Sequence, residues 1–303
     1  MISVFGSANM DLVAYTGRAP ALGETVTGHA FRTIPGGKGA NQAVAAARAG
    51  ARTAFIGAVG DDAFGPQIRA ALADAGVDVS RLRTVPGPSG IAHIVVEDSG
   101  GNSIIVIPGA NGTVTGPAED DVAVIRRSAA LLLQLELPMD AVVAAARAAR
   151  ASGRERPAVV LTPAPARELP AELLQAVDLI VPNEHEAAAI TGETDPEKAL
   201  AALLATVPEA VVTLGGEGAL YGSRGSAPVH VPAFKVEATD TTAAGDTFAG
   251  ALAVARTEGM PPERALRFAS AAAALSVQRE GASTSMPTRS EIDAFLTVSG
   301  GNP

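Results

Sequence analysis

The chain has 303 residues, of which 47% are hydrophobic, and this length allows one large α/β domain or two small ones around a sizeable core. Its formal net charge of −9, with no basic block, argues against a surface that follows a nucleic-acid backbone. The absence of cysteine excludes disulfides, thiolate metal sites and a cysteine nucleophile.

The chain carries no sign of a membrane or export segment. The N-terminal stretch lacks the charged segment and apolar run of a signal peptide. No run of about 18 apolar residues occurs, as a membrane-spanning helix would need. We therefore expect a cytoplasmic protein that does not bind or span a membrane.

The first predicted element is a buried strand over the apolar residues 2–5, followed by a loop that contains Asn9 and Asp11. In open α/β sheets, ligands bind beyond the carboxyl ends of the strands. Asn9 and Asp11 alternate, so their side chains can point the same way into such a site. An ordinary Asx turn is the alternative explanation for both residues.

Two segments are rich in β-forming residues and differ from the rest of the chain. Residues 12–35 predict short exposed strands among polar residues, glycine and proline. Residues 89–107 predict a hairpin, because two β-rich runs flank a turn at 98–102. Together they predict a small sheet that projects from the main domain and covers a pocket.

A glycine-rich loop at 35–42 leads into an alanine-rich helix that Gly50 ends. Lys38, Asn41 and Gln42 are spaced i, i+3 and i+4, so they share one helix face. The loop is not a Walker A motif, because that motif needs Ser or Thr after its lysine and Gly39 stands there. No G-x-G-x-x-G follows a predicted strand, which argues against a dinucleotide-binding domain.

From residue 53 onward, uniformly apolar strands alternate with helices. Strands are predicted near 53–60, 130–136, 158–165, 178–182 and 210–215, and helices near 63–76, 140–153, 184–192 and 263–278. This alternation predicts a parallel sheet that helices cover on both faces. With no linker or repeat in the sequence, we expect residues 1–303 to form one domain, with a lid from about 12–35 and 89–107.

Polar residues follow the predicted strands, as expected for a ligand site. Glu136 follows one strand, Asn183 and Glu186 follow another, and Thr213 precedes the glycines at 215, 216 and 218. Each has a simpler explanation. Asn183 and Glu186 have the spacing of a capping box, and the glycines can form a tight turn.

The stretch 240–252 is predicted to be a loop that enters a buried helix, since Phe248, Ala251 and Leu252 share one helix face. Small residues before Asp246 leave the helix start uncovered, and a helix start favours an anion. A carboxylate beside a phosphate is useful if it removes a proton from the attacking hydroxyl. The alternative is an acidic residue that stabilises its own helix dipole.

With these features the sequence resembles the ribokinase-like (PfkB) family of carbohydrate kinases from Ser3 to about Leu296. The stretch 36–51 is similar to the family's N-terminal sugar signature, and 240–252 to its C-terminal catalytic signature. The blocks GSANMDLV, QLELP, LTPAPARELP, VPNEHEA and TLGGEG are also similar, in order and spacing. The resemblance implies a three-layer sandwich with a mostly parallel central sheet, helices on both faces and a small β-sheet lid.

The resemblance also implies roles for individual residues. It makes Asp246 the general base and the backbone of Ala243, Ala244 and Gly245 an anion hole. It implies a sugar-binding set: Asn9, Met10, Asp11, Gly37, Lys38, Gly39, Ala40, Asn41, Glu136 and Asp246. It implies a nucleotide-binding set: Asn183, Glu186, Thr213, Leu214, Gly215, Gly216, Glu217, Gly218, Gly245, Asp246 and Ser270. It implies a monovalent-cation site, normally for K⁺: Asp240, Thr242, Ser276, Arg279, Gly281 and Ser285.

The implied activity is transfer of the ATP γ-phosphate to O5 of D-ribose, with Mg²⁺ and K⁺ as cofactors and a homodimer formed through the lid. With an ordinary pKa near 3.9, Asp246 would be ionised at neutral pH. Thr162, Ser270 and His93 depart from the usual family residues. The alternatives are a kinase for 2-deoxyribose, another pentose, a ketohexose or a nucleoside, and a sugar-binding regulator without turnover.

Overall fold

The strands form two sheets in the computed structural model, which describes residues 1–151, 153 and 156–299. The larger sheet has nine strands in the order β13 (Val229–Val231), β12 (Ala219–Ser223), β11 (Glu209–Thr213), β10 (Leu179–Ile180), β9 (Ala158–Leu161), β8 (Ala130–Leu133), β1 (Ile2–Phe5), β4 (Thr53–Gly60) and β5 (Val77–Val85). The pairs β11–β12 and β12–β13 are antiparallel, and the other neighbouring strands of this sheet are parallel. The prediction of a mostly parallel central sheet is therefore confirmed.

Both faces of the larger sheet are buried, because successive side chains of its strands enter two different cores. In β8, Leu132 packs into one core, whereas Leu131 and Leu133 pack into the other. The first core is completed by α1 (Lys38–Arg48), α2 (Phe64–Asp74), α8 (Ala244–Thr257), α9 (Pro262–Ser276) and α10 (Arg289–Ser299). The second core is completed by α3 (Glu119–Arg126), α4 (Met139–Arg150), α5 (Ala171–Ala176), α6 (Glu184–Thr191) and α7 (Pro196–Thr206).

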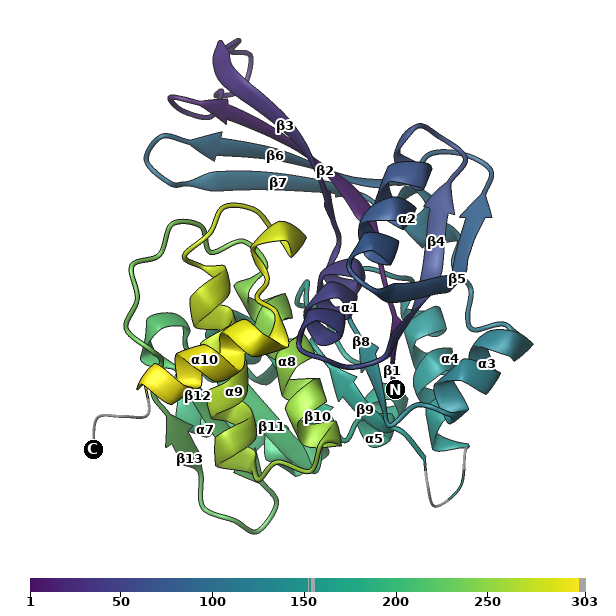
Figure 1. The fold of residues 1–303 in the computed structure, drawn as a ribbon, viewed down its shortest axis with the longest axis vertical. Helices are drawn as coiled ribbons and strands as arrows, with labels where there is room; N and C mark the ends of the chain where they lie inside the picture. Colours follow the sequence, from purple (N-terminus) through teal and green to yellow (C-terminus); the bar gives the residue numbers. More distant parts are fainter. Residues whose placement is uncertain (152, 154–155, 300–303) are drawn as a thin grey trace.

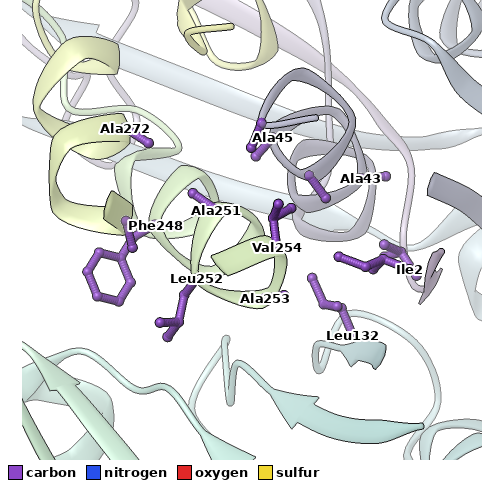
Figure 2. Close-up of a cluster of buried hydrophobic side chains, with 14 of the residues drawn as sticks. Ile2, Ala43, Ala45, Leu132, Phe248, Ala251, Leu252, Ala253, Val254 and Ala272 are labelled. Atoms are coloured by element: carbon purple, nitrogen blue, oxygen red, sulfur yellow. The ribbon is translucent and has the colours of Figure 1, made fainter. Parts of the chain in front are cut away.

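Helix α8 lies in the middle of the first core, between α1 and α9 (Figure 2). Its residues from Asp246 to Ala255 are all buried. The approach to α1 is close at Gly250, where a Cβ atom would lie 2.6 Å from the Cβ of Ala45 and 2.8 Å from the carbonyl oxygen of Gln42. Only glycine allows the two backbones this near to each other. This contact sets the first turn of α8 beside the first turns of α1.

The smaller sheet has the order β3 (Gly28–Gly36), β2 (Asn9–Thr16), β6 (Gly90–Glu97) and β7 (Asn102–Ile107). It projects from the body of the molecule, as Figure 1 shows. Strands β6 and β7 form the predicted hairpin. The ion pair between Arg32 of β3 and Glu280 of the body, at 2.8 Å, connects this sheet to the segment after α9.

Several elements were not anticipated from the sequence, namely β5, β12, β13, α3, α5, α7 and α10. Strand β5 lies at an edge of its sheet, and only Val77 and Leu82 are buried, while its other residues are exposed or half-buried and include several charges. Helices α3 and α5 are short and bury only two residues each, so their apolar period is weak. Among the described residues, no helix has both the length and the apolarity needed to cross a bilayer.

Candidate active site

The candidate site lies where the order of the larger sheet reverses. From β1 the chain first builds β4 and β5 on one side, and it later adds β8 on the other side. Such a switch point leaves a crevice at the carboxyl ends of the strands, where α/β proteins bind ligands. The segment after β1 carries Asn9 and the segment after β8 carries Glu136, so two of the predicted residues meet at this edge.

Asp246 lies in the first turn of α8, whose N-cap is Ala243. Ala243 has φ 58° and is the only residue other than glycine with a positive φ in the described part of the chain. This left-handed conformation costs alanine about 1–2 kcal/mol, and such strain is concentrated at functional sites. The N–H groups of Ala243, Gly245 and Asp246 make no hydrogen bond to any described residue, whereas that of Ala244 donates to Thr241 O at 3.2 Å. The helix start therefore offers free donors to an anion.

Asp246 is 7% exposed, and its carboxylate is held by two amides from α1. Asn41 Nδ2 donates to Oδ2 at 3.2 Å, and Gln42 Nε2 donates to Oδ1 at 3.1 Å. Burial raises the pKa of Asp246; Lys38 and the two amides oppose this, and Glu136 adds to it. The expectation of an ordinary pKa for Asp246 is therefore wrong, because the sequence does not reveal how completely the packing of α8 removes water.

Gln42 belongs to the helix face that the spacing predicted, but the family resemblance did not include it in the site. Its Nε2 also donates to Thr162 Oγ1 at 3.1 Å, and its Oε1 accepts from Gln134 Nε2 at 2.7 Å. The i, i+4 spacing from Lys38 was the available signal for Gln42. Nothing in the sequence connects it to Gln134 or Thr162, which follow strands β8 and β9.

Lys38 and Glu136 meet at the start of α1. Glu136 Oε2 accepts from the backbone N–H of Lys38 at 2.9 Å and from the hydroxyl of Ser7. Burial acts to lower the pKa of the Lys38 ammonium, but four surrounding carboxylates more than offset it and raise the pKa; they belong to Asp246, Glu136, Glu186 and Asp11. Lys38 is thus a fully charged cation in the middle of an acidic site.

Asn9 and Asp11 lie in strand β2 and not in the predicted loop, and their alternation, which the sequence did predict, puts both side chains on one face of that strand. The Oδ1 atom of Asn9 accepts from Asn111 Nδ2 at 2.7 Å, and Asn111 also bonds the backbone of Ala8. Burial, with the charges of Glu136 and Asp246, raises the pKa of Asp11 to about 7 although Lys38 opposes it. Sequence reasoning missed Asn111, which lies in a short 3₁₀ turn after β7.

The remaining predicted sugar-site residues shape the backbone or the core. Gly37, with φ 92°, precedes α1, and a Cβ there would lie 2.8 Å from the backbone nitrogen of Asn9. A Cβ on Gly39 would lie 2.6 Å from the backbone nitrogen of Ser7. Met10 and Ala40 are buried in the first core. These residues let the loop after β1 and the start of α1 approach each other closely.

Two cavities adjoin the start of α8. The first, of about 450 Å³, has many of the predicted nucleotide-site residues in its wall, including Thr213, Gly215, Gly216, Gly218, Ala244, Gly245 and Ser270. Leu214 and Glu217 belong to the same turn but are not in this wall. The second cavity, of about 400 Å³, lies between the small sheet and the body and contains Asp11 and Arg32 in its wall. Ala238 and Thr241 contribute to both cavities.

Asn183 and Glu186 form the capping box at the start of α6. Asn183 Oδ1 accepts from Glu186 N at 2.8 Å, and Glu186 Oε2 accepts from Asn183 N at 2.9 Å. The simpler structural explanation of this pair is therefore confirmed. It leaves Glu186 Oε1 uncommitted, and burial raises the pKa of Glu186 although its bond from Asn183 and the nearby Lys38 lower it.

The predicted monovalent-cation residues lie in two segments that meet after α9. Asp240 accepts from Thr242 N through Oδ1 and from Gly281 N through Oδ2, both at 2.9 Å. Arg279 N donates to Ser276 O at 3.1 Å, while the Arg279 side chain pairs with Glu291. Ser285 ends a nearby 3₁₀ turn. The structure thus brings Asp240, Thr242 and Gly281 together directly.

Comparisons with known proteins agree over almost the whole chain. Residues 1–289 match the sequence profile of the pfkB family carbohydrate kinases. The ribokinase of Bacillus subtilis is 44% identical over 299 residues, which cover 98% of this chain and 99% of that protein. The deoxyribokinase of Salmonella typhi is 37% identical and covers 98% of this chain and 99% of its own length. The structure of Arabidopsis thaliana ribokinase complexed with ribose and ATP superposes with a TM-score of 0.91 at 37% identity, covering 97% of this chain and 98% of its own.

Proposed function

The chain belongs to the pfkB family of carbohydrate kinases, and from its site we propose that it transfers the γ-phosphoryl group of ATP to the O5 hydroxyl of D-ribose. The observation that carries the proposal is the buried Asp246 carboxylate, which lies beside Lys38 at an open helix start whose residues Ala244 and Gly245 line the first cavity. This arrangement brings a base, a cation and free backbone donors to one point.

In the proposed reaction, Asp246 accepts the proton of the O5 hydroxyl while O5 forms a bond to the γ-phosphorus. The bond between that phosphorus and the bridging oxygen breaks, and the electron pair leaves with ADP. A carboxylate whose pKa is raised by burial is a better base than an exposed one, provided that it stays ionised. Lys38 and the amides of Asn41 and Gln42 favour the ionised form. The free N–H groups of the α8 start stabilise charge on the transferring group.

For ATP, the first cavity provides an apolar wall at Phe248 and Val277 and open backbone at Gly215 and Gly216, where an added Cβ would meet no atom within 4 Å. Mg²⁺ prefers carboxylate oxygens. Glu186 retains one oxygen outside its capping box, so Glu186 and Asn183 would support Mg²⁺ and the phosphates. When bound there, Mg²⁺ would neutralise part of the negative charge of the ATP phosphates.

For K⁺, we propose the segment pair around Asp240 and Gly281. Gly281 has φ 99°, and the left-handed turn there brings it to the Asp240 carboxylate. Hard cations such as K⁺ are bound by oxygen ligands, and most ligands here would be backbone carbonyls. Their arrangement depends on the two hydrogen bonds that Asp240 accepts from backbone N–H groups.

We propose that the small sheet acts as a lid and as the contact of a homodimer. Its strands β2, β3, β6 and β7 wall the second cavity together with residues after α8 and α9. Strand β7 is an edge strand with every residue exposed, and Ile105 is 67% exposed. An apolar edge strand of this kind is usually covered by a partner. A second copy of the chain is the proposed partner.

The test is Asp246→Asn, which keeps the shape of the side chain but removes the base. We expect kcat to fall by about 10²–10⁴ in an ADP-release assay with ribose, the usual scale for loss of a general base. Calorimetry should still detect ATP binding. Asp74→Asn, at an exposed position near the end of α2, is the matched control and should behave as wild type. If Asp246→Asn retains activity within tenfold of wild type, the proposed role is wrong.

The second candidate acceptor is 2-deoxyribose, because the deoxyribokinase of Salmonella typhi is also similar over the whole chain. A site that hydrogen-bonds the 2-hydroxyl group discriminates strongly against a sugar that lacks it. A panel of pentoses and ketohexoses in the ADP-release assay separates the two candidates. No ADP release with any sugar would favour a sugar-binding regulator instead.

A further inference from the structure

Beneath Asp246 lies a buried chain of three polar side chains from three different parts of the sequence. Gln42 of α1 is in the middle, with Gln134 after β8 on one side and Thr162 after β9 on the other. Gln42 and Gln134 are each 1% exposed and Thr162 is 8% exposed. Burying such groups is costly unless they are hydrogen-bonded, and these three bond one another, although Gln134 Oε1 has no partner among the described residues.

The hydrogen bonds of this chain determine which end of the Gln42 amide faces Asp246. Gln134 Nε2 is a donor and bonds Gln42 Oε1 at 2.7 Å, which directs the carbonyl oxygen of Gln42 away from the carboxylate. The two N–H bonds of Gln42 Nε2 then go to Thr162 Oγ1 and Asp246 Oδ1, both at 3.1 Å. If the Gln42 amide were reversed, its carbonyl oxygen would face the Asp246 carboxylate and its NH₂ group would face the NH₂ group of Gln134.

From this geometry we infer that Gln42, itself oriented by Gln134 and Thr162, is a positioning residue that fixes the Asp246 carboxylate for proton transfer. Gln42 bonds Oδ1 and Asn41 bonds Oδ2, so rotation of the carboxylate would break both bonds. Each carboxylate oxygen can accept more than one hydrogen bond, which leaves room for the acceptor hydroxyl. The inference rests on the proposed function, because it assumes that Asp246 is the base.

Other charged groups also act on Asp246, and the test has to separate their effects. Lys38 on α1 lowers the pKa of Asp246, whereas Glu136 after β8 raises it, and Asp11 on β2 carries a like charge nearby. None of them donates a hydrogen bond to the carboxylate among the described residues. Variants of Gln42 and Thr162 change the hydrogen bonding but leave these charges in place.

The experiment compares Gln42→Met with wild type, using the sugar that wild type phosphorylates fastest. Methionine keeps the length of the side chain and removes its hydrogen bonds. We expect kcat to fall about 10- to 100-fold, the scale for one hydrogen bond to a charged group. The sugar KM should change less than about threefold. The acidic limb of the kcat–pH profile should move to higher pH, because an amide donor favours the ionised carboxylate.

Gln67→Met, on the exposed face of α2, is the matched control and should match wild type in all three measurements. If Gln42→Met is folded by circular dichroism but has the kcat and pH profile of wild type, the inference is overturned. A purely structural role would lower the melting temperature and leave the pH profile in place, and that result also overturns it.

If Gln42→Met does not fold, a pair of milder variants decides. Thr162→Val removes the hydroxyl that accepts from Gln42 and should lower kcat about fivefold, with the same shift of the acidic limb. Thr162→Ser keeps the hydroxyl and should restore most of that rate. Wild-type kinetics in Thr162→Val would overturn the inference. Asp246→Asn distinguishes failure of this inference from failure of the proposed function. Full activity of Asp246→Asn would refute the role of Asp246 as the base. If Asp246→Asn is inactive while the Gln42 and Thr162 variants behave as wild type, only the positioning role of Gln42 is refuted.

Discussion

Gly250 is the position where one added methyl group tests how α8 places Asp246. A Cβ there would lie 2.6 Å from Ala45 Cβ, 2.8 Å from Gln42 O and 3.0 Å from Ala46 N. Ordinary carbon contacts lie at about 3.5–4.0 Å, so α8 has to move away from α1 by about 1 Å. Two of the three contacting atoms belong to the backbone and cannot turn aside.

For Gly250→Ala, overpacking costs about 1–3 kcal/mol, and the better helix propensity of alanine returns about 1 kcal/mol. A net loss of about 1 kcal/mol would lower the melting temperature by about 2–4 °C. The kinetic effect should be larger. Asn41 and Gln42 reach Asp246 at 3.2 and 3.1 Å, so a shift of this size breaks both bonds. We expect kcat to fall about 10- to 100-fold, the order found for a misplaced catalytic group.

The assays are thermal unfolding followed by fluorescence and steady-state ADP release with ribose and ATP. Gly17→Ala is the control, because Gly17 is exposed and its nearest neighbour would be 3.9 Å from an added Cβ. A variant that is less stable but keeps kcat within twofold of wild type would refute the idea that the spacing of α8 and α1 positions the base. A variant with increased stability would refute the close packing itself, because the gain in helix propensity would then be unopposed.

Three further predictions concern pH, assembly and cations. Because the pKa of Asp11 is raised to about 7, the sugar KM should rise as the pH falls below about 7, and Asp11→Asn should remove this dependence. Because of the same shift, the Asp11 carboxyl is protonated in the folded state but ionised in the unfolded state between pH 3.8 and about 7. The free energy of unfolding of wild type should therefore fall relative to that of Asp11→Asn as the pH rises through this range. Ile105→Lys should convert the proposed dimer to a monomer in light scattering, whereas a wild-type monomer would contradict the dimer. Asp240→Ala should remove the stimulation of the rate by KCl over choline chloride, and an unchanged stimulation would place the cation elsewhere.

Much of the fold follows from local pattern alone. Apolar runs such as 2–5 and 53–60 alternate with helix-forming segments along the chain. This alternation predicts a parallel sheet with helices on both faces. The hairpin at 89–107 is predicted by its turn, and β6 and β7 have that form. The elements that were missed, such as β5 and α3, have weak periodicity because they bury few residues at the edge of the fold.

The sequence by itself also placed a carboxylate at the start of a buried helix and put Lys38, Asn41 and Gln42 on one face of another, because both features depend only on spacing within a helix. Tertiary structure alone decided that the two helices meet, since that contact depends on Gly250 and on packing between residues about 200 positions apart, as in the bond from Gln42 to Asp246. It also decided the raised pKa values of Asp246 and Asp11. Those shifts come from exclusion of water and from charges that different strands bring together, and neither is encoded in any local stretch of the chain.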